Sequence, residues 1–282
     1  MRKISTILSV ILCLAIFTSC SLGTSNSSDK NNGEGDDNTT QTSPLLETPS
    51  GQAPGLYNSV TGELKYTWAE LQVRGFVTVK ENFVTKSVDY LIGDLYIPNG
   101  ILGIGKSAFS GCTGLVSVST GDGITTIGNS AFNGCTGLIR VELGNSITNI
   151  GTKAFGNCTR LQEISIPDSV TNIGANAFLG CTGLKSAHIG DGVTNIGSST
   201  FSGCAGLKSV RIGKNVTYIG TNTFKNCEVL ATVNYNGTKN SWNAILIDKK
   251  NDQLYAASVI TTDPPIIIED NSGELNQFDI TE

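Results

Sequence analysis

The 282-residue chain has few of the residues on which enzymes rely for catalysis. It contains one histidine, one methionine and two tryptophans, and 15% of its residues are charged. Because His188 is the single histidine and no CxxC pair occurs, the chain lacks the usual ligand sets for zinc. It also has no HExxH or GxSxG string. We therefore expect a protein that is not an enzyme and that holds neither a metal nor a cofactor.

The chain also lacks an apolar run long enough to cross a membrane as a helix. The stretch Ile7–Phe17 has about 11 residues, whereas a spanning helix needs about 20, so it is typical of a secretory signal. It is followed by Ser19 and Cys20, which resemble the end of a bacterial lipoprotein signal, whose cysteine is lipidated. We predict a lipoprotein signal peptide at residues 1–19 and lipidation of Cys20. The alternative is an ordinary signal peptide with Cys20 incidental.

Positive charge is scarce. The formal net charge is −5, and removal of residues 1–19, which contain Arg2 and Lys3 and no acidic residue, would change it to −7. A phosphate-binding surface needs a basic patch, so we expect no nucleic-acid partner. Residues 263–282 contain six acidic residues and no Lys or Arg, and we predict that they form an acidic flexible tail.

Residues 20–55 contain few large apolar side chains and are rich in Ser, Asn, Thr, Gly and Asp. Such a segment cannot bury enough surface to offset the entropy lost on ordering. We predict a flexible tether whose ends lie roughly 30 Å apart, from the usual scaling of flexible linkers. The lipid on Cys20 would then be the only membrane contact.

The dominant feature of the sequence is a 23-residue repeat. The string SAFSGCTGL at Ser107–Leu115 returns as SAFNGCTGL at Ser130–Leu138 and in four more divergent copies. A fixed period of this length indicates a solenoid, in which each coil buries its apolar side against its neighbours. Two residue types recur in register and are predicted to form the core: Phe109, Phe132, Phe155, Phe178, Phe201 and Phe224, and Cys112, Cys135, Cys158, Cys181, Cys204 and Cys227.

Each repeat contains a strand signal and a turn signal. In the second cycle, the period-two alternation at Ile139–Leu143 predicts a short strand, and equivalent strands would pair in parallel about 4.8 Å apart. The half-repeat Ile92–Ile97 brings the number of such rungs to seven. The string NSAFNGC predicts one turn of α- or 3-10 helix with its apolar side inward. The residue before each repeat cysteine is Gly or Asn, which predicts a left-handed residue that ends this turn.

The repeat resembles the BspA-like bacterial leucine-rich repeat. VTNIGANAFLGCTGL, from Val170, and LQEISIPDS, from Leu161, carry the resemblance. It implies an α/β repeat solenoid: a right-handed coil with a parallel β-sheet on one face and short helical or 3-10 turns on the other, capped at both ends. The corresponding domains are an N-terminal cap at residues 56–91, a solenoid of a half-repeat and six cycles at 92–238, and a C-terminal cap at 239–262.

Departures from the repeat mark places where we expect looser packing. Thr replaces Ala at Thr200 and Thr223, and Thr120 occupies the last strand position of the first cycle.

Six repeat cysteines in an exported chain would ordinarily suggest disulfides. Here each is stacked under its equivalent at an inward position, where a free cysteine acts as a small hydrophobe with a weak hydrogen-bond donor. We predict a reduced, buried ladder. Bridges between neighbouring coils remain an alternative, because a Cα spacing of about 4.8 Å permits them.

Side chains between the apolar strand positions would face outward in two files and form the candidate binding face. One file is Asp94, Ser117, Arg140, Glu163, Ser186, Ser209 and Thr232, and the other is Tyr96, Ser119, Glu142, Ser165, His188, Arg211 and Asn234. Arg140 and Glu163 lie on adjacent rungs and could form an exposed ion pair. Glu142, His188 and Arg211 are spread over several rungs, so we do not expect a catalytic group.

These features predict a non-enzymatic, lipid-anchored and surface-exposed protein of the bacterial cell envelope. The resemblance implies an adhesin or protein-protein interaction module that attaches to host matrix or other cell-surface proteins. One alternative is an envelope scaffold that binds the bacterium's own proteins or polysaccharide. Another is a glycan-binding module, although Tyr96 is the single aromatic residue in the two files.

Overall fold

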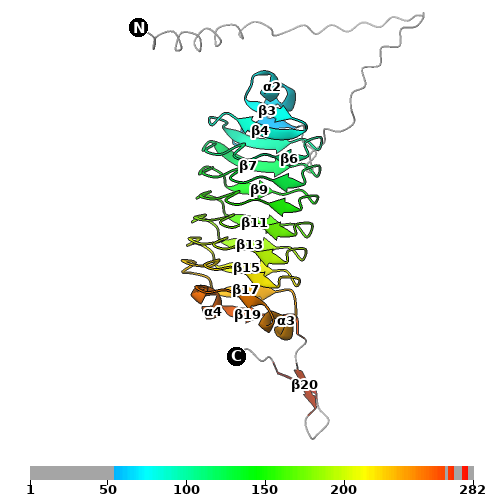
Figure 1. Cartoon of the computed structure of the whole chain (residues 1–282), viewed down its shortest axis with the longest axis vertical. Coiled ribbons are helices and arrows are strands. Elements are labelled where there is room, and N and C mark those ends of the chain that lie inside the picture. Colours follow the sequence, from blue (N-terminus) through cyan, green and yellow to red (C-terminus); the bar gives the residue numbers. More distant parts are fainter. Residues whose placement is uncertain (1–53, 264–265, 270–274, 279–282) are drawn as a thin grey trace, which may run out of the picture. The chain divides into compact units, whose positions relative to one another are not determined.

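The computed structural model describes residues 54–263, 266–269 and 275–278 (Figure 1). Residues 54–263 form a β-solenoid of about eight turns with 23-residue repeats, parallel sheets and little helix. The predicted signal peptide, the lipidated Cys20 and nearly all of the tether lie outside the described residues. Strand β1 begins at Gly55, so the predicted tether would end slightly earlier than residue 55. Within the described part of the chain, no helix is long and apolar enough to cross a membrane.

One side of each coil contributes a rung strand, and these strands pair in parallel with their neighbours. Hydrogen-bonded pairing is interrupted once, between the third and fourth rungs, so the rungs divide into two sheets. The last rung comes from the C-terminal segment and was not predicted from the sequence. The rungs are β5 (Gly93–Ile97), β7 (Leu115–Thr120), β9 (Arg140–Glu142), β11 (Glu163–Ile166), β13 (Ser186–Ile189), β15 (Ser209–Ile212), β17 (Thr232–Tyr235) and β19 (Ser258–Ile260).

A second, nine-stranded sheet runs along another side of the coils and was also not predicted. Most of its strands have two residues, too few to show the alternation by which a strand is recognised in a sequence. Their pairing is parallel except at the N-terminal end, where β3 and β4 are antiparallel. The strands are β3 (Val77–Lys80), β4 (Phe83–Ser87), β6 (Gly103–Ile104), β8 (Thr126–Ile127), β10 (Asn149–Ile150), β12 (Asn172–Ile173), β14 (Asn195–Ile196), β16 (Tyr218–Ile219) and β18 (Leu246–Ile247).

The segment predicted as a helical turn forms hydrogen-bonded turns and no regular helix. In the third cycle, Asn157 has a φ of 57°, as predicted for the residue before the cysteine, and Lys153 has a φ of 56°, which was not predicted. Equivalent residues in the other coils are also left-handed. Two left-handed residues only four positions apart prevent a right-handed helix from continuing. The prediction of helical or 3-10 turns was therefore wrong, although its inward apolar side is present.

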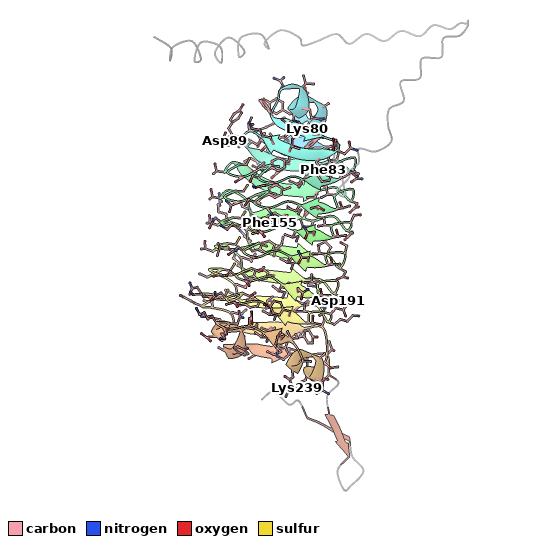
Figure 2. The ribbon with its side chains drawn as sticks, in the orientation of Figure 1. Lys80, Phe83, Asp89, Phe155, Asp191 and Lys239 are labelled. Atoms are coloured by element: carbon pink, nitrogen blue, oxygen red, sulfur yellow. The ribbon has the colours of Figure 1, made fainter. Side chains whose placement is uncertain are left out.

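The six repeat phenylalanines stack ring over ring through the solenoid. Successive ring centroids are 5.1–5.6 Å apart and the ring planes differ by 2–11°. All six side chains are fully buried. Phe155, the third of the six, lies in the middle part of the solenoid (Figure 2). The stack therefore forms a continuous apolar spine between the coils.

The six repeat cysteines are free thiols and buried, so the structure contains the reduced ladder rather than bridges. In five coils the sulfur donates to the carbonyl oxygen of the phenylalanine in the preceding coil, over 3.1–3.3 Å. Cys112, in the first coil, donates to the Val88 carbonyl instead. Each thiol thus links two coils.

The expected loosening at Thr200 and Thr223 does not occur. Both side chains are fully buried, and their hydroxyl groups donate to the carbonyl oxygens of Gly197 and Gly220 at 2.6 and 2.7 Å. A buried hydroxyl that finds a partner within its own coil is compatible with close packing.

Additional elements lie at the two ends of the repeats. Before the first rung are β1 (Gly55–Tyr57), which pairs antiparallel with β5, then β2 (Leu64–Thr67) and α2 (Trp68–Val73). Thr67 and Glu70 form a capping box on α2. After the seventh rung are α3 (Lys239–Asn243) and α4 (Asp252–Ala256).

Within the segment predicted as an acidic tail, β20 (Ile266–Glu269) and β21 (Leu275–Phe278) form an antiparallel hairpin.

Candidate binding face

The outward side chains of β5, β7, β9, β11, β13, β15 and β17 form one continuous surface, here called the rung face. On β11, Ile164 and Ile166 are buried, whereas Glu163 and Ser165 between them are exposed. This alternation follows from the pleat of the strand, which sends successive side chains to opposite sides of a sheet.

The twelve candidate binding residues differ in their exposure to solvent. Exposed ones are Arg140, Glu142, Glu163, Ser165 and Arg211, and half-buried ones are Asp94, Tyr96, Ser186, His188, Ser209, Thr232 and Asn234. Ser119, in the second file, departs from the expected outward exposure, because only 4% of it is exposed.

Two hollows lie on the rung face and share Arg140 and Glu142. The long groove, of about 720 Å³, extends from β9 to Asn234 on β17. The Tyr96 pocket, of about 290 Å³, lies over β5, β7 and β9. The rung face is therefore hollowed along most of its length.

The long groove begins where strand pairing is interrupted, between β9 and β11. The hydroxyl of Thr120 accepts a hydrogen bond from the Gly144 backbone N–H at 2.8 Å and donates to the Glu142 carbonyl at 3.4 Å. Leu143, which follows β9, is half-buried and lines the groove, whereas the corresponding Ile166 is fully buried. Thr120 is thus hydrogen-bonded to the end of the third rung, where the apolar side chain of Leu143 lies at the groove.

Charges on the rung face are not neutralised by ion pairs. The pair that Arg140 and Glu163 could have formed is absent. The one ion pair among the described residues joins Lys214 to Asp191, at 3.8 Å. The groove therefore presents both signs of charge to solvent.

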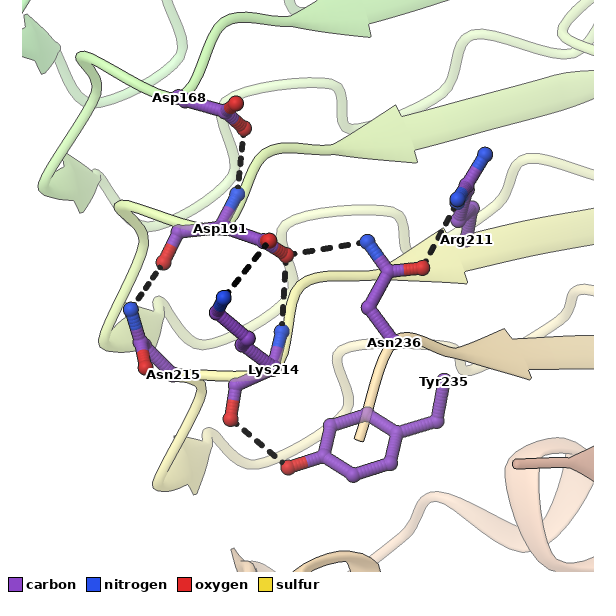
Figure 3. Close-up of polar contacts among 7 residues, drawn as sticks. All are labelled: Asp168, Asp191, Arg211, Lys214, Asn215, Tyr235 and Asn236. Atoms are coloured by element: carbon purple, nitrogen blue, oxygen red, sulfur yellow. Dashed lines mark hydrogen bonds and ion pairs between the residues drawn. The ribbon is translucent and has the colours of Figure 1, made fainter. Parts of the chain in front are cut away.

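Arg211 is held in place by a polar cluster at the edge of the groove (Figure 3). Its Nε donates to Asn236 Oδ1 at 2.8 Å, and Asn236 Nδ2 donates to Asp191 Oδ1 at 3.0 Å. Asp191 also accepts from the backbone N–H of Lys214 at 3.0 Å. The hydrogen bond from Asn236 is the main reason why the pKa of Asp191 is lowered, with smaller contributions from Lys214 and Arg211. The guanidinium is thus pre-oriented before any partner arrives.

The side chain of His188 contacts the adjacent rung. Its Nδ1 lies 3.4 Å from the Ser165 hydroxyl on the adjacent rung, and no hydrogen bond between His188 and Glu142 or Arg211 is present among the described residues. In the same part of the chain, no cluster of three or more His, Cys, Asp or Glu side chains is arranged to hold a metal.

One string, GILGIGKS at Gly100–Ser107, matches the phosphate-loop pattern GxxxxGK[ST]. That pattern binds phosphate only where a glycine-rich loop leads from a strand into a helix. Here Gly103 and Ile104 form strand β6, and turns rather than a helix follow Lys106. A Cβ on Gly105 would lie 2.9 Å from the Val84 carbonyl oxygen of the neighbouring coil, so this glycine serves coil packing. The string is therefore a coincidence of the repeat.

Comparison with known proteins agrees with this architecture. Residues 89–205 and 148–246, together more than half of the chain, match the BspA type leucine rich repeat region in six copies. A leucine-rich repeat protein of T. pallidum is 26% identical, with a TM-score of 0.53 over 64% of this chain and 92% of that one. No curated protein matches the chain.

Two further solved structures are similar over part of their length. A leucine-rich cell surface protein from Faecalibacterium prausnitzii is 28% identical, with a TM-score of 0.48 over 61% of this chain and 41% of that one. A leucine-rich repeat protein from Bacteroides ovatus is 24% identical, with a TM-score of 0.41 over 57% and 54%. The chain thus spans about half the length of these two proteins.

Proposed function

Since this chain belongs to the BspA-type leucine-rich repeat family, we propose that it is a non-enzymatic surface protein of a bacterial cell envelope whose rung face binds another protein. The observation that carries the proposal is the long groove, which is lined by unpaired charges of both signs. Complementary charge on a partner would give such a surface specificity and a fast association rate.

Arg211 is the side chain best prepared for a partner. Arginine is enriched among the residues that dominate binding energy at protein interfaces, and a side chain that is already ordered loses less entropy on binding. Asn236 and Asp191 supply that order. We propose that Arg211 is an anchor of the interface and that Leu143, at the other end of the groove, adds apolar contact.

The location of the protein belongs to the same proposal. Removal of residues 1–19 and lipidation of Cys20 would attach the chain to the envelope, with the segment between Cys20 and the start of the folded part as the tether. Attachment to host matrix proteins or to other cells follows if the solenoid faces outward. Protease treatment of intact cells separates this role from that of an inward-facing scaffold, because an outward-facing solenoid is released and an inward-facing one is retained.

The binding role is tested with the purified full chain and immobilised extracellular-matrix proteins. We expect saturable binding that falls about tenfold or more in Arg211→Glu, since charge reversal turns an attraction at the groove into a repulsion. The matched control is Arg160→Glu, an exposed arginine outside the rung strands, which should bind like the unsubstituted chain. Absence of saturable binding, or equal losses in both variants, would contradict the proposal.

A further inference from the structure

The Tyr96 pocket contains a buried polar atom without a partner. Ser119 lines the pocket, is 4% exposed, and its hydroxyl has no hydrogen-bond partner in the described structure. More than nine in ten buried polar groups in proteins are hydrogen-bonded, because an unpaired one costs free energy of desolvation. The Ser119 oxygen is covered in the free protein, so a ligand hydroxyl group would supply the missing partner once the Ser119 side chain rotates toward the pocket.

An aromatic ring forms part of the same pocket. Tyr96 on β5 is half-buried and lines it, and Tyr57 on β1 packs against Tyr96 edge to face, with ring centroids 5.1 Å apart and planes at 73°. This contact fixes the Tyr96 ring before a ligand binds. A rigid ring at the wall of a pocket is suited to packing against an apolar ligand face.

The remaining polar groups of the pocket include both hydrogen-bond acceptors and a donor. Asp94 and Glu142 provide carboxylates, and Arg140 provides a guanidinium. Asp94 already accepts a hydrogen bond from the Ser117 hydroxyl at 2.8 Å. Burial, and then the charges of Asp94 and Glu142, raise the pKa of Tyr96. Asp94, Tyr96, Arg140 and Glu142 all line this one small space.

We infer that the Tyr96 pocket binds one neutral sugar unit of a glycan. Each sugar hydroxyl both donates and accepts, so a single ring can bond to Asp94, Arg140 and the buried Ser119 together, while its C–H face packs on Tyr96. A basic ligand would meet the charge of Arg140, and an acidic ligand would meet two carboxylates. The volume of about 290 Å³ is near the lower limit for small-molecule sites, which suits one sugar ring.

The pocket also opens toward the rest of the rung face. Arg140 and Glu142 line both the pocket and the long groove, so a longer glycan held by one unit can continue into the groove. The inference goes beyond the proposed protein-binding role and does not depend on it.

The test uses the purified full chain on a printed array of monosaccharides of defined structure, followed by calorimetric titration of the monosaccharide that binds most strongly, which is too short to reach the long groove. Ser119→Ala, Tyr96→Ala and Glu142→Gln should each weaken sugar binding by about tenfold, the factor that the loss of one good hydrogen bond or ring contact gives. Ser165→Ala and Glu163→Gln are the matched controls on the next rung, outside the pocket, and should stay within about twofold.

Ser119→Ala keeps the test informative even if another variant folds poorly, because it removes only an unpaired hydroxyl group. The inference is overturned if no saccharide binds or if the controls lose as much affinity as the pocket variants. Binding of matrix proteins, measured on the same variants, separates the two proposals: loss of sugar binding with intact protein binding leaves the long groove as the protein site.

Discussion

The thiol of Cys158 donates a hydrogen bond to the carbonyl oxygen of Phe132, one coil earlier, at 3.3 Å. The same carbonyl accepts the backbone N–H of Cys135 at 3.2 Å, so both of its lone pairs are used. An alanine or valine at this position would fill space but would leave the buried carbonyl with one partner fewer. The cysteine therefore contributes both packing and a donor between coils.

Stability should depend on pH through these thiols. Burial raises the pKa of Cys135 and Cys227 to about 12, from an ordinary value of 9.0. Well below pH 9 the thiols are protonated in both the folded and the unfolded state. Between pH 9 and 12 the unfolded chain loses protons that the folded chain keeps, so we expect the free energy of unfolding to fall as the pH rises.

Urea unfolding as a function of pH measures this effect, and Cys135→Ala should reduce the slope above pH 9 because one of the shifted groups is gone. Thiol labelling is the companion measurement: the repeat cysteines should react slowly in the native protein and rapidly in urea. Rapid labelling of most of them without denaturant would contradict the buried ladder.

Phe155→Ala should lower the free energy of unfolding by about 3–5 kcal/mol, because the missing ring leaves a cavity in the middle of a rigid stack. Phe83→Ala serves as the control, since Phe83 lies on β4, is half-buried and stands outside the stack. Chemical denaturation of both variants gives the comparison. A cost below about 1 kcal/mol at Phe155 would contradict the packing described above.

Lys153→Asn should stabilise the protein by up to about 1 kcal/mol, because Lys153 is exposed and left-handed and asparagine adopts this conformation more readily. The corresponding residues in other coils include Asn176 and Asn222. Lys106→Asn is the matched control: Lys106 is also exposed but is not left-handed, so no gain is expected. Thermal unfolding of the two variants distinguishes a backbone effect from a change of charge.

Two adjacent buried hydroxyl groups on β7 should respond in opposite ways to removal. Ser119→Ala deletes an unpaired group and should leave stability unchanged or raise it by about 1 kcal/mol. Thr120→Val deletes the partner of the Gly144 N–H and should lower stability by about 1–3 kcal/mol. Chemical denaturation of the two variants measures the difference. If Ser119→Ala lowered the free energy of unfolding as much as Thr120→Val, the Ser119 hydroxyl would not be unpaired.

Much of the architecture was predictable because it repeats. The 23-residue spacing of Phe155 and Cys158 with their equivalents reveals a stack of coils, and the rung strands carry enough alternation to be recognised. The two-residue strands of the nine-stranded sheet carry no such signal. The left-handed Lys153 was missed because lysine has no preference for that conformation, whereas Gly or Asn before the cysteine does.

The candidate site was only partly predictable. The order of Arg140, Glu163 and Arg211 on successive rungs follows from the period, but whether they pair depends on side-chain geometry. Ser119 looked like another outward hydroxyl, and its burial next to Tyr96 follows from how β5, β7 and β9 pack.

The sequence by itself determined which residues stack, because a fixed period places identical side chains above one another whatever their detailed conformation. Only the tertiary structure decided where the rungs separate, which hydroxyl stays unpaired and where the face is hollowed. Those features lie at or near departures from the repeat such as Thr120, whose buried hydroxyl accepts a hydrogen bond from the backbone N–H of Gly144. The repeat can be recognised in the sequence alone, whereas the irregular features of the candidate site depend on contacts between coils.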